Sequence, residues 1–377
     1  MEREIERARE REPIEMDYAF HESKFIAREK ELSRIALLPH VLKYDKFPWG
    51  QTQMAYDKKF VCDLTLDKQA NNAPIYTIAT LEQSIPPGAA SGRHRHFVEA
   101  VFYVVEGKGW EIHDGQRYPW EAGDLFLVPT YAIHQHNTDP STSARLFFVI
   151  PVPFTAMGVG HQILEFHEWN ARFRMPPTAE PIRDKEGKLI GYRRQDGVEV
   201  KHVYEAPALK DALEAKWRAP NIQPPVKDHY DEYIAKWHKE AQWRRTCPHI
   251  IKGSQQPWEN TRMGRMKYLL APHINSATVT FDSYIQEIPP GGRSGKHRHA
   301  TEEVIKVIKG RGHDVHDGKH WDWDSEDVIC IPMFATHQHF NDDPKEPAQL
   351  LSIQSRFYSF IEHGGVEHLE DAPEYKR

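Results

Sequence analysis

The sequence predicts an all-β protein built from two similar barrels, and three observations lead to this prediction. The first is the length of 377 residues, which is too long for one typical domain and suits two that can each bury a core. The second is an internal repeat. The third is the pattern inside each repeat, where short alternating apolar segments end in turn residues. Helices are expected only at the N-terminus and between the barrels.

The repeat is visible in two stretches of near-identical sequence. Residues 86–96 are PPGAASGRHRH and residues 289–299 are PPGGRSGKHRH. From here to the third histidine of each copy, His134 or His337, every landmark is displaced by a constant 203 positions. A constant shift over this length indicates two copies of one structural unit. An earlier segment is also repeated. It begins at Lys43 in the first copy and at Lys252 in the second, a shift of 209 positions.

The repeat divides the chain into four predicted parts. They are an N-terminal helical extension, a first barrel, a connector with helices, and a second barrel with a C-terminal tail: residues 1–39, 40–154, 155–248 and 249–377.

Each repeat is expected to be β throughout. IYTIATLEQSIPPG in the first copy alternates apolar and polar residues and ends in a Pro-Pro-Gly turn. Asp-Gly pairs at 114–115 and 317–318 supply the residues with positive φ that tight hairpins need. Many short antiparallel strands separated by turns are typical of a barrel or a jelly roll.

The parts outside the repeats differ in character. Residues 1–39 are rich in Glu, Arg and Lys and predict one or two surface helices. In the connector, RDKEGKLIGYRR resembles a hairpin, whereas DHYDEYIAKWHKEAQWRR has helical spacing of its apolar residues. This helix could pack on the barrels or on another subunit, or it could be a solvated face. A homo-oligomer is therefore expected.

Composition excludes several classes of protein. A net charge of −6 and a pI near 6.4 give no reason to expect a nucleic-acid partner. The N-terminus is charged from its second residue, unlike a secretory signal, and no apolar run is long enough for a membrane span. Three distant cysteines do not indicate a disulfide framework. We expect a soluble, cytoplasmic protein.

Histidines at strand spacing predict a metal site in the first repeat. Residues i and i+2 of a strand share a face, so His94 and His96 can offer two imidazoles to one ion. A third ligand must come from another strand, and His134, just after a Val-Pro strand end, suits this role.

The second repeat carries the same set with an added carboxylate. His297, His299 and His337 match the three histidines, and Glu303 follows on the next stretch. The first repeat has Ala100 at that position, with Glu99 one residue out of register and so on the opposite face. Three imidazoles, with or without a carboxylate, suit Fe, Mn, Ni, Cu or Zn and leave coordination positions open.

Two further histidines are candidate catalytic residues. His136 and His339 follow the third histidine of each set by two residues. Each is either a base beside the metal or an outward-facing residue near the mouth of the barrel. His113 and His316 belong to hairpin turns and are expected to be exposed. No Gly-rich phosphate loop, Ser-His-Asp ordering or nucleophilic cysteine context is present.

These motifs resemble the cupin signature, G-x5-H-x-H-x3-E-x6-G followed by P-x4-H. The second repeat matches it in full, and the first matches it except for the glutamate. The chain thus resembles bicupins, which implies two double-stranded β-helix, or jelly-roll, barrels over residues 40–360.

Within bicupins, the first repeat resembles gentisate 1,2-dioxygenase and its salicylate and 1-hydroxy-2-naphthoate relatives. HRHFVEAVFYVVEGKG is similar to that family's HRH-x3-A-x2-F-x2-EG-x-G stretch, and GDLFLVPTYAIHQHN to its GD-x4-P-x4-H-x-H segment. The resemblance implies that His94, His96 and His134 are Fe(II) ligands and that His136 lies beside the site. Two features depart from the family: its second cupin usually lacks ligands, and its Trp before the third histidine is Ile133 here.

The resemblance implies a non-haem Fe(II) dioxygenase that uses O₂ to open the ring of a hydroxylated aromatic acid, as in the catabolism of aromatic compounds. The alternatives are a metal-dependent bicupin of another class (a decarboxylase, hydrolase, lyase or isomerase with Mn, Ni or Zn) and a non-catalytic bicupin that binds a small molecule.

Overall fold

The computed structural model describes residues 29–30, 33–51, 55–61, 73–96, 98–130, 132–153, 162–164, 180–183, 185–186, 189–193, 199–201, 225–271, 274, 278–357 and 365–375. The chain divides into two compact segments, Met1–Pro39 and His40–Arg377. In the first, residues 29–30 and 33–35 are helical, and most of the predicted N-terminal extension lies outside the described residues. No helix in the described ranges is long and apolar enough to span a membrane.

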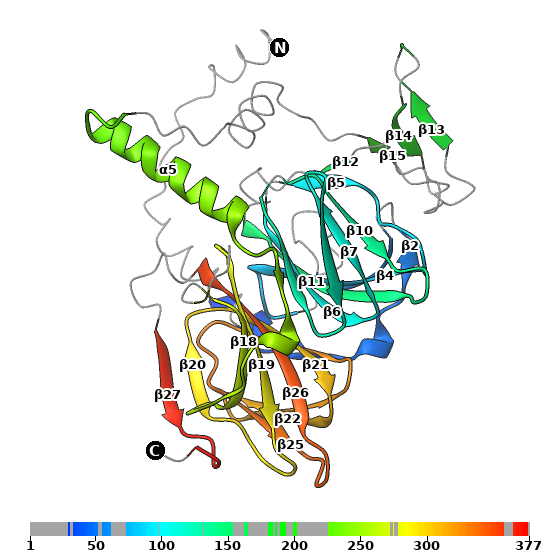
Figure 1. Ribbon diagram of the computed structural model, residues 1–377. Helices are drawn as coiled ribbons and strands as arrows, with labels where there is room; N and C mark the ends of the chain where they lie inside the picture. The colour runs from blue at the N-terminus through cyan, green and yellow to red at the C-terminus, as the bar shows by residue number, and fades with distance from the viewer. Residues whose placement is uncertain are drawn as a thin grey trace, which may run out of the picture. The chain divides into compact units, whose positions relative to one another are not determined.

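The strands of the first repeat form two antiparallel sheets (Figure 1). The larger has seven strands in the order β16 (Ile250–Ile251), β9 (Leu125–Val128), β6 (Ala100–Glu106), β11 (Ala144–Pro151), β4 (Ile78–Ile85), β3 (Tyr56–Val61) and β2 (Gly50–Gln51). The smaller has five, in the order β12 (Gln162–Leu164), β5 (His94–His96), β10 (His134–Thr138), β7 (Lys108–His113) and β8 (Gln116–Glu121).

The second repeat has the same two sheets. Its seven-stranded sheet has the order β1 (Val41–Leu42), β24 (Val328–Ile331), β21 (Glu303–Lys309), β26 (Ala348–Ser355), β19 (Phe281–Ile288), β18 (Gly264–Leu270) and β17 (Glu259–Thr261). Its five-stranded sheet has the order β23 (Lys319–Asp324), β22 (Arg311–His316), β25 (His337–Asn341), β20 (Lys296–His299) and β27 (Val366–Glu370). The C-terminal β27 runs beside β20 in Figure 1.

The mostly-β prediction is confirmed, but closed barrels are not observed. Among the described residues no strand pair joins the five-stranded sheet of a repeat to its seven-stranded sheet. The chain turns sharply where it passes from one sheet to the other, between β6 and β7 at Gly107 (φ 87°) and between β21 and β22 at Gly310 (φ 103°). A Cβ at Gly107 would lie 2.0 Å from the carbonyl oxygen of Ser143, so only glycine fits this corner.

The predicted hairpins are present at both Asp-Gly pairs. Asp114 and Gly115 connect β7 to β8, and Asp317 and Gly318 connect β22 to β23, with φ between 47° and 84° at all four residues. Two consecutive residues with positive φ give the turn a twist that matches the flanking strands.

The described residues of the connector include a small sheet and a helix. The predicted hairpin is β13 (Glu180–Arg183) and β14 (Leu189–Arg193), joined by β15 (Glu199–Lys201). Helix α5 (His229–Thr246) is capped by the Asp228 side chain, which accepts from the Asp231 amide. Its aromatic residues Tyr230, Tyr233 and Trp237 are exposed, so this face of the helix does not pack on the sheets.

The two repeats exchange their first strands. β1 begins the first repeat yet pairs with β24 of the second, and β16 begins the second repeat yet pairs with β9 of the first. The short 3₁₀ helices η1 (Tyr44–Lys46) and η3 (Gly253–Gln255) follow these strands. Lys43 pairs with Asp327 at 2.7 Å, and Lys252 pairs with Asp124 at 2.6 Å. The segment that repeats with a shift of 209 is therefore the exchanged segment.

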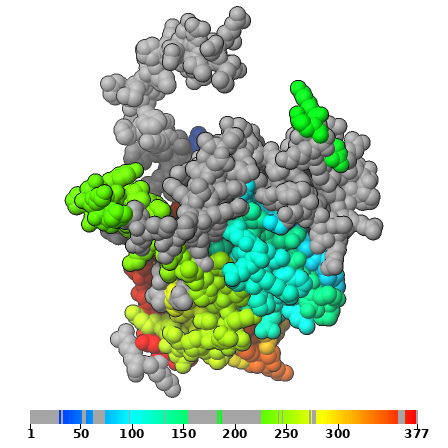
Figure 2. All heavy atoms as spheres, turned by 45° about the horizontal axis from the view of Figure 1, so that its top comes forward, coloured from blue at the N-terminus to red at the C-terminus, as the bar shows by residue number. Residues whose placement is uncertain are grey.

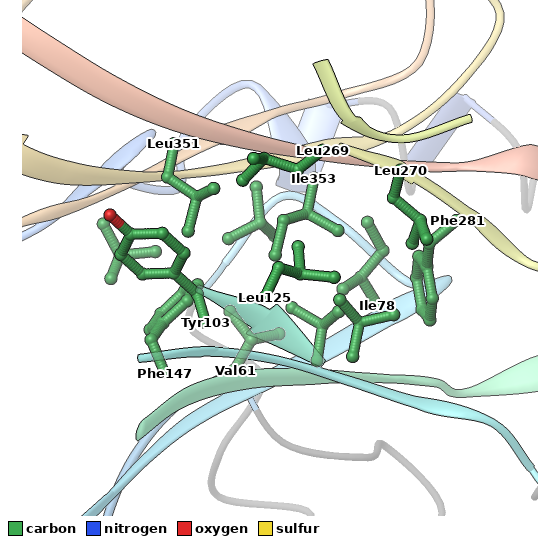
Figure 3. Packing of buried hydrophobic residues seen from close by; sticks show 14 of the residues in the cluster. Val61, Ile78, Tyr103, Leu125, Phe147, Leu269, Leu270, Phe281, Leu351 and Ile353 are labelled. Atoms are coloured by element: carbon green, nitrogen blue, oxygen red, sulfur yellow. The ribbon is translucent and has the colours of Figure 1, made fainter. Parts of the chain in front are cut away.

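The main hydrophobic core lies where the seven-stranded sheets of the two repeats meet. Figure 3 shows Ile78, Tyr103 and Phe147 of the first repeat packed against Leu351 and Ile353 of the second. The surfaces of the two repeats adjoin on the face shown in Figure 2, where cyan atoms of the first lie against yellow-green atoms of the second. Two smaller cores lie inside the repeats.

Candidate metal centres

The structure brings together the three histidines predicted in the first repeat, here called the first site. His94 and His96 come from β5, and His134 comes from β10, which pairs with β5 at His94. Ring centroids lie 4.0 Å apart for His94 and His134, and 4.7 Å apart for His96 and His134. All three rings are buried, with one ring nitrogen of each within 4.8 Å of the others. This spacing suits one shared ion.

Backbone carbonyls fix the tautomer of each ring. The Nδ1 atoms of His94, His96 and His134 lie 3.1, 2.5 and 2.9 Å from the carbonyl oxygens of Gly92, Val98 and Ala132. A carbonyl only accepts, so each Nδ1 carries the proton and each Nε2 keeps its lone pair. The Nε2 atom of His134 is buried without a partner among the described residues, which fits a metal ligand.

Burial keeps these rings neutral. It lowers the pKa of His94 and His134 well below the usual value, helped by the other histidines, and lowers the pKa of His96 to about 4. Neutral imidazole is the form that binds a metal ion.

The second site contains His297 and His299 on β20, His337 on β25 and Glu303 on β21, all buried. The carboxylate of Glu303 lies 3.0 Å from His299 Nε2 and 3.7 Å from His337 Nε2. The hydroxyls of Tyr284 and Ser352 donate to its other oxygen. Burial alone would raise the pKa of Glu303, but the hydrogen bonds with His299 and Ser352 and the electrostatic effect of the nearby His337 outweigh it and lower the pKa to about 2.

The two sites differ in a coordinated way. Ser352 lies opposite Tyr284 in the second repeat, whereas the same register in the first repeat places Phe148 opposite Leu81. The carboxylate of Glu303 and its two hydroxyl donors are thus replaced together by Ala100, Leu81 and Phe148. Glu99 does not join the first site, because its side chain bonds to residues of the second repeat.

Stacked phenylalanines line the first repeat next to its site. Phe102 stacks on Phe126 and on Phe148, with centroids 4.7 Å apart in both pairs, and its ring lies 4.5 Å from that of His136. Phe148 is only partly buried. The inner face of this repeat therefore offers an aromatic surface beside a neutral group of imidazoles.

His136 and His339 lie on the inner face next to each site, since each follows a site histidine by two residues on one strand. Each ring centroid lies 5.6 Å from that of His134 or His337. The His136 Nδ1 atom is 2.6 Å from Glu111, and the His339 Nδ1 atom is 2.8 Å from Asp314. Burial raises the pKa of Glu111 to about 7. The outward-facing alternative does not hold for either histidine.

The expectation that His113 and His316 are exposed was wrong. Both are buried, because each shares the inner face of its strand with an acidic residue two positions away, Glu111 or Asp314. His40 and His249 contact these two rings and were not predicted as site residues from the sequence. A signal existed, since Pro39-His40 and Pro248-His249 extend the segment that repeats with a shift of 209.

Comparison with known proteins agrees with this architecture. The protein-family model described as "Cupin domain" matches this chain twice, at residues 81–150 and 284–354. The chain is a bicupin.

Relatives of this bicupin include aromatic-ring dioxygenases. It is 23% identical over 286 residues to 1-hydroxy-2-naphthoate 1,2-dioxygenase of Nocardioides sp. (strain KP7). The matched region covers 75% of this chain and 64% of the relative. The chain thus spans less than two thirds of that relative's length. Proteins named gentisate 1,2-dioxygenase match at similar identity.

Two solved structures share the fold. Salicylate 1,2-dioxygenase from Pseudaminobacter salicylatoxidans superposes with a TM-score of 0.53 at 16% identity, over 88% of each chain. A variant of oxalate decarboxylase from Bacillus subtilis gives a TM-score of 0.53 at 14% identity, over 88% of this chain and 80% of the other.

Proposed function

We propose that this bicupin is a non-haem Fe(II) dioxygenase that opens the ring of a hydroxylated aromatic acid at its first site. The observation that carries the proposal is the first site itself, where three neutral imidazoles direct their Nε2 lone pairs toward one another beside stacked phenylalanines. Relatives named as naphthoate and gentisate dioxygenases support the same reaction class.

In this proposal His94, His96 and His134 hold the ion. Fe(II) held there would supply open coordination positions and the redox chemistry that ring opening with O₂ requires. Three neutral ligands leave the charge of the ion uncompensated, which favours an anionic substrate. Imidazole ligands also suit Zn, Cu and Ni, so the metal is itself part of the proposal.

Residues around the ion would position the substrate and move protons. The partly exposed ring of Phe148, which stacks on the buried Phe102, suits the ring of the substrate, because offset stacking of aromatic rings is favourable. The Nδ1–H of His136 bonds to Glu111, so its Nε2 is left to exchange a proton with the substrate hydroxyl. The apolar wall at Ala100 and Leu81 excludes water from this side.

Uptake of O₂ tests the proposal. Protein loaded anaerobically with Fe(II) is mixed with salicylate, gentisate or 1-hydroxy-2-naphthoate in an oxygen electrode. We expect consumption of one O₂ per ring opened with at least one of these acids, and none with benzoate, which lacks the hydroxyl. No uptake with any hydroxylated acid would overturn the proposal.

A second candidate function concerns the second site. Glu303 adds a hydrogen-bonded carboxylate to the three histidines, and the chain shares its fold with an oxalate decarboxylase. A lyase or decarboxylase reaction with Mn(II) at this site is the alternative. Turnover of a carboxylic acid without net consumption of O₂, abolished by His297→Ala and retained in His94→Ala, would favour it.

A further inference from the structure

A chain of four polar side chains leads away from the second site. His339 Nδ1 lies 2.8 Å from Asp314 Oδ2, and the same oxygen lies 3.0 Å from His316 Nε2. His316 Nδ1 in turn lies 2.7 Å from His40 Nδ1. All four residues are buried, and the indole N–H of Trp323 donates to the remaining carboxylate oxygen at 2.8 Å.

The first repeat contains the same order of groups, with one longer contact. His136 Nδ1 lies 2.6 Å from Glu111 Oε2, whereas His113 Nε2 lies 3.5 Å from Glu111 Oε1, an ion-pair distance, and these two atoms form no hydrogen bond within the described part of the chain. His113 Nδ1 then lies 2.8 Å from His249 Nδ1. The order of groups, histidine, carboxylate, histidine and histidine, is therefore built twice from residues at matching positions.

The last histidine in each series of polar side chains comes from the opposite repeat: His249 reaches the first repeat, and His40 reaches the second. His249 directly precedes β16, the strand that the second repeat contributes to the first, and its carbonyl accepts from the Leu127 amide at 2.9 Å. His40 precedes β1 in the same way, and its carbonyl accepts from the Cys330 amide at 2.7 Å. The exchange of strands thus places one histidine of each repeat against the inner face of the other.

Hydrogen-bond chemistry assigns a role to these two histidines. A neutral imidazole has one N–H and one lone pair, and two Nδ1 atoms in contact must be one donor and one acceptor. In the second repeat His316 Nε2 donates to Asp314, so its Nδ1 accepts from His40. Asp314 only accepts and so favours the proton on His316 Nε2, and His40 reinforces this tautomer by donating to Nδ1. Without His40, the Nδ1 lone pair of His316 is left without this donor, and the tautomer with the proton on Nε2 is less strongly favoured. Asp314 would then lose a fixed hydrogen-bond donor. The bond between Asp314 and His339, which orients the His339 ring, would be held less firmly.

We propose that His249 is a positioning residue for the first site and His40 for the second, so that each repeat completes the hydrogen-bonded support of the site in the other. Each fixes the tautomer of its histidine partner and, through the carboxylate, the orientation of the histidine beside the site. The effect on turnover rests on the proposed function, whereas the effect on tautomers does not.

Nitrogen NMR of ¹⁵N-histidine-labelled, metal-free protein tests the tautomers directly. We expect His113 and His316 of the wild type each to show one protonated and one bare ring nitrogen. We expect His249→Ala to move the two nitrogens of His113 toward averaged positions and to leave His316 unchanged. His40→Ala does the reverse. His249→Asn and His40→Asn place an amide N–H near the Nδ1 position and restore the wild-type pattern.

Kinetics provide a second readout in the Fe(II)-loaded enzyme. We expect His249→Ala to lower kcat about tenfold, within the range seen for outer partners of metal sites, with little change in KM and with recovery in His249→Asn. His40→Ala serves as the control for the first-site reaction and keeps its kcat.

The outcomes separate the two claims. If each alanine variant leaves both tautomer patterns unchanged, or disturbs both repeats equally, the positioning roles are overturned. If the tautomer changes occur as described but no substrate is turned over, the positioning roles hold and the proposed dioxygenase activity fails.

Discussion

Glu99 and Glu302 occupy equivalent positions in the two repeats, and each binds the backbone of the opposite repeat. The Glu99 carboxylate accepts from the amides of Val279 and Thr280 at 3.0 and 2.7 Å. The Glu302 carboxylate accepts from the amides of Tyr76 and Thr77 at 2.8 and 2.5 Å. Both carboxylates are buried. The repeats are therefore joined by a reciprocal pair of carboxylate–amide contacts as well as by exchanged strands.

Removal of one of these carboxylates should loosen the contact between the repeats. Glu302→Ala leaves two amides and the Thr77 hydroxyl without their acceptor, and each buried unpaired donor costs about 1–3 kcal/mol. We expect the free energy of unfolding in urea to fall by about 3 kcal/mol. Glu302→Gln keeps an acceptor oxygen and should lose clearly less. Equal losses in both variants would show that the hydrogen bonds are not the cause.

A cross-repeat ion cluster predicts how stability depends on pH. Glu326 of the second repeat bonds to Arg145 of the first at 2.9 Å and to Lys306 at 2.8 Å. Burial alone would raise the pKa of Glu326, but these partners outweigh it and lower the pKa to about 2. Its contribution is therefore fully present above the unfolded value near 4.5 and is lost as pH falls toward 2.

Acid denaturation of Glu326→Gln checks this account. The variant should be less stable than the wild type at pH 6, and the difference should shrink between pH 4.5 and 2. Glu367→Gln is the matched control, because its ion pair with Arg298 is exposed on both sides and contributes little. A constant difference between Glu326→Gln and wild type across this range would contradict the assigned pKa shift.

The first site has Ala100 where the second has Glu303. Introducing a glutamate at position 100 tests whether the first site can stabilise a buried carboxylate. Ala100→Glu places a carboxylate beside Leu81 and Phe148, which offer no donors, so burial of the charge is unfavourable. We expect a drop of about 3 kcal/mol in the stability of the metal-free protein. Adding Leu81→Tyr and Phe148→Ser reproduces the donors of the second site and should recover part of the loss, as measured by urea unfolding.

Much of this organisation could be predicted from sequence because it depends on local spacing. The HxH pairs place His94 and His96 on one face of a strand, and a constant shift relates the two repeats. The exchange of strands could not be predicted, since β1 has the same apolar pattern whichever sheet it joins. The repeat marks His40 and His249 as equivalent residues, but it does not reveal which sheet each one joins, so their place beside the opposite site was not predicted. His113 was expected to be exposed because a turn position does not reveal the buried Glu111 beside it.

The most direct test of the central claim combines metal content with O₂ uptake in wild type, His94→Ala and His297→Ala. Proteins purified anaerobically and loaded with Fe(II) are analysed for iron and assayed with the hydroxylated acid that supports uptake. We predict that His94→Ala loses the iron of the first site together with all O₂ uptake, and that His297→Ala loses the metal of the second site but keeps most of the uptake. Full uptake in His94→Ala, with its loss in His297→Ala, would contradict the assignment of the reaction to the first site.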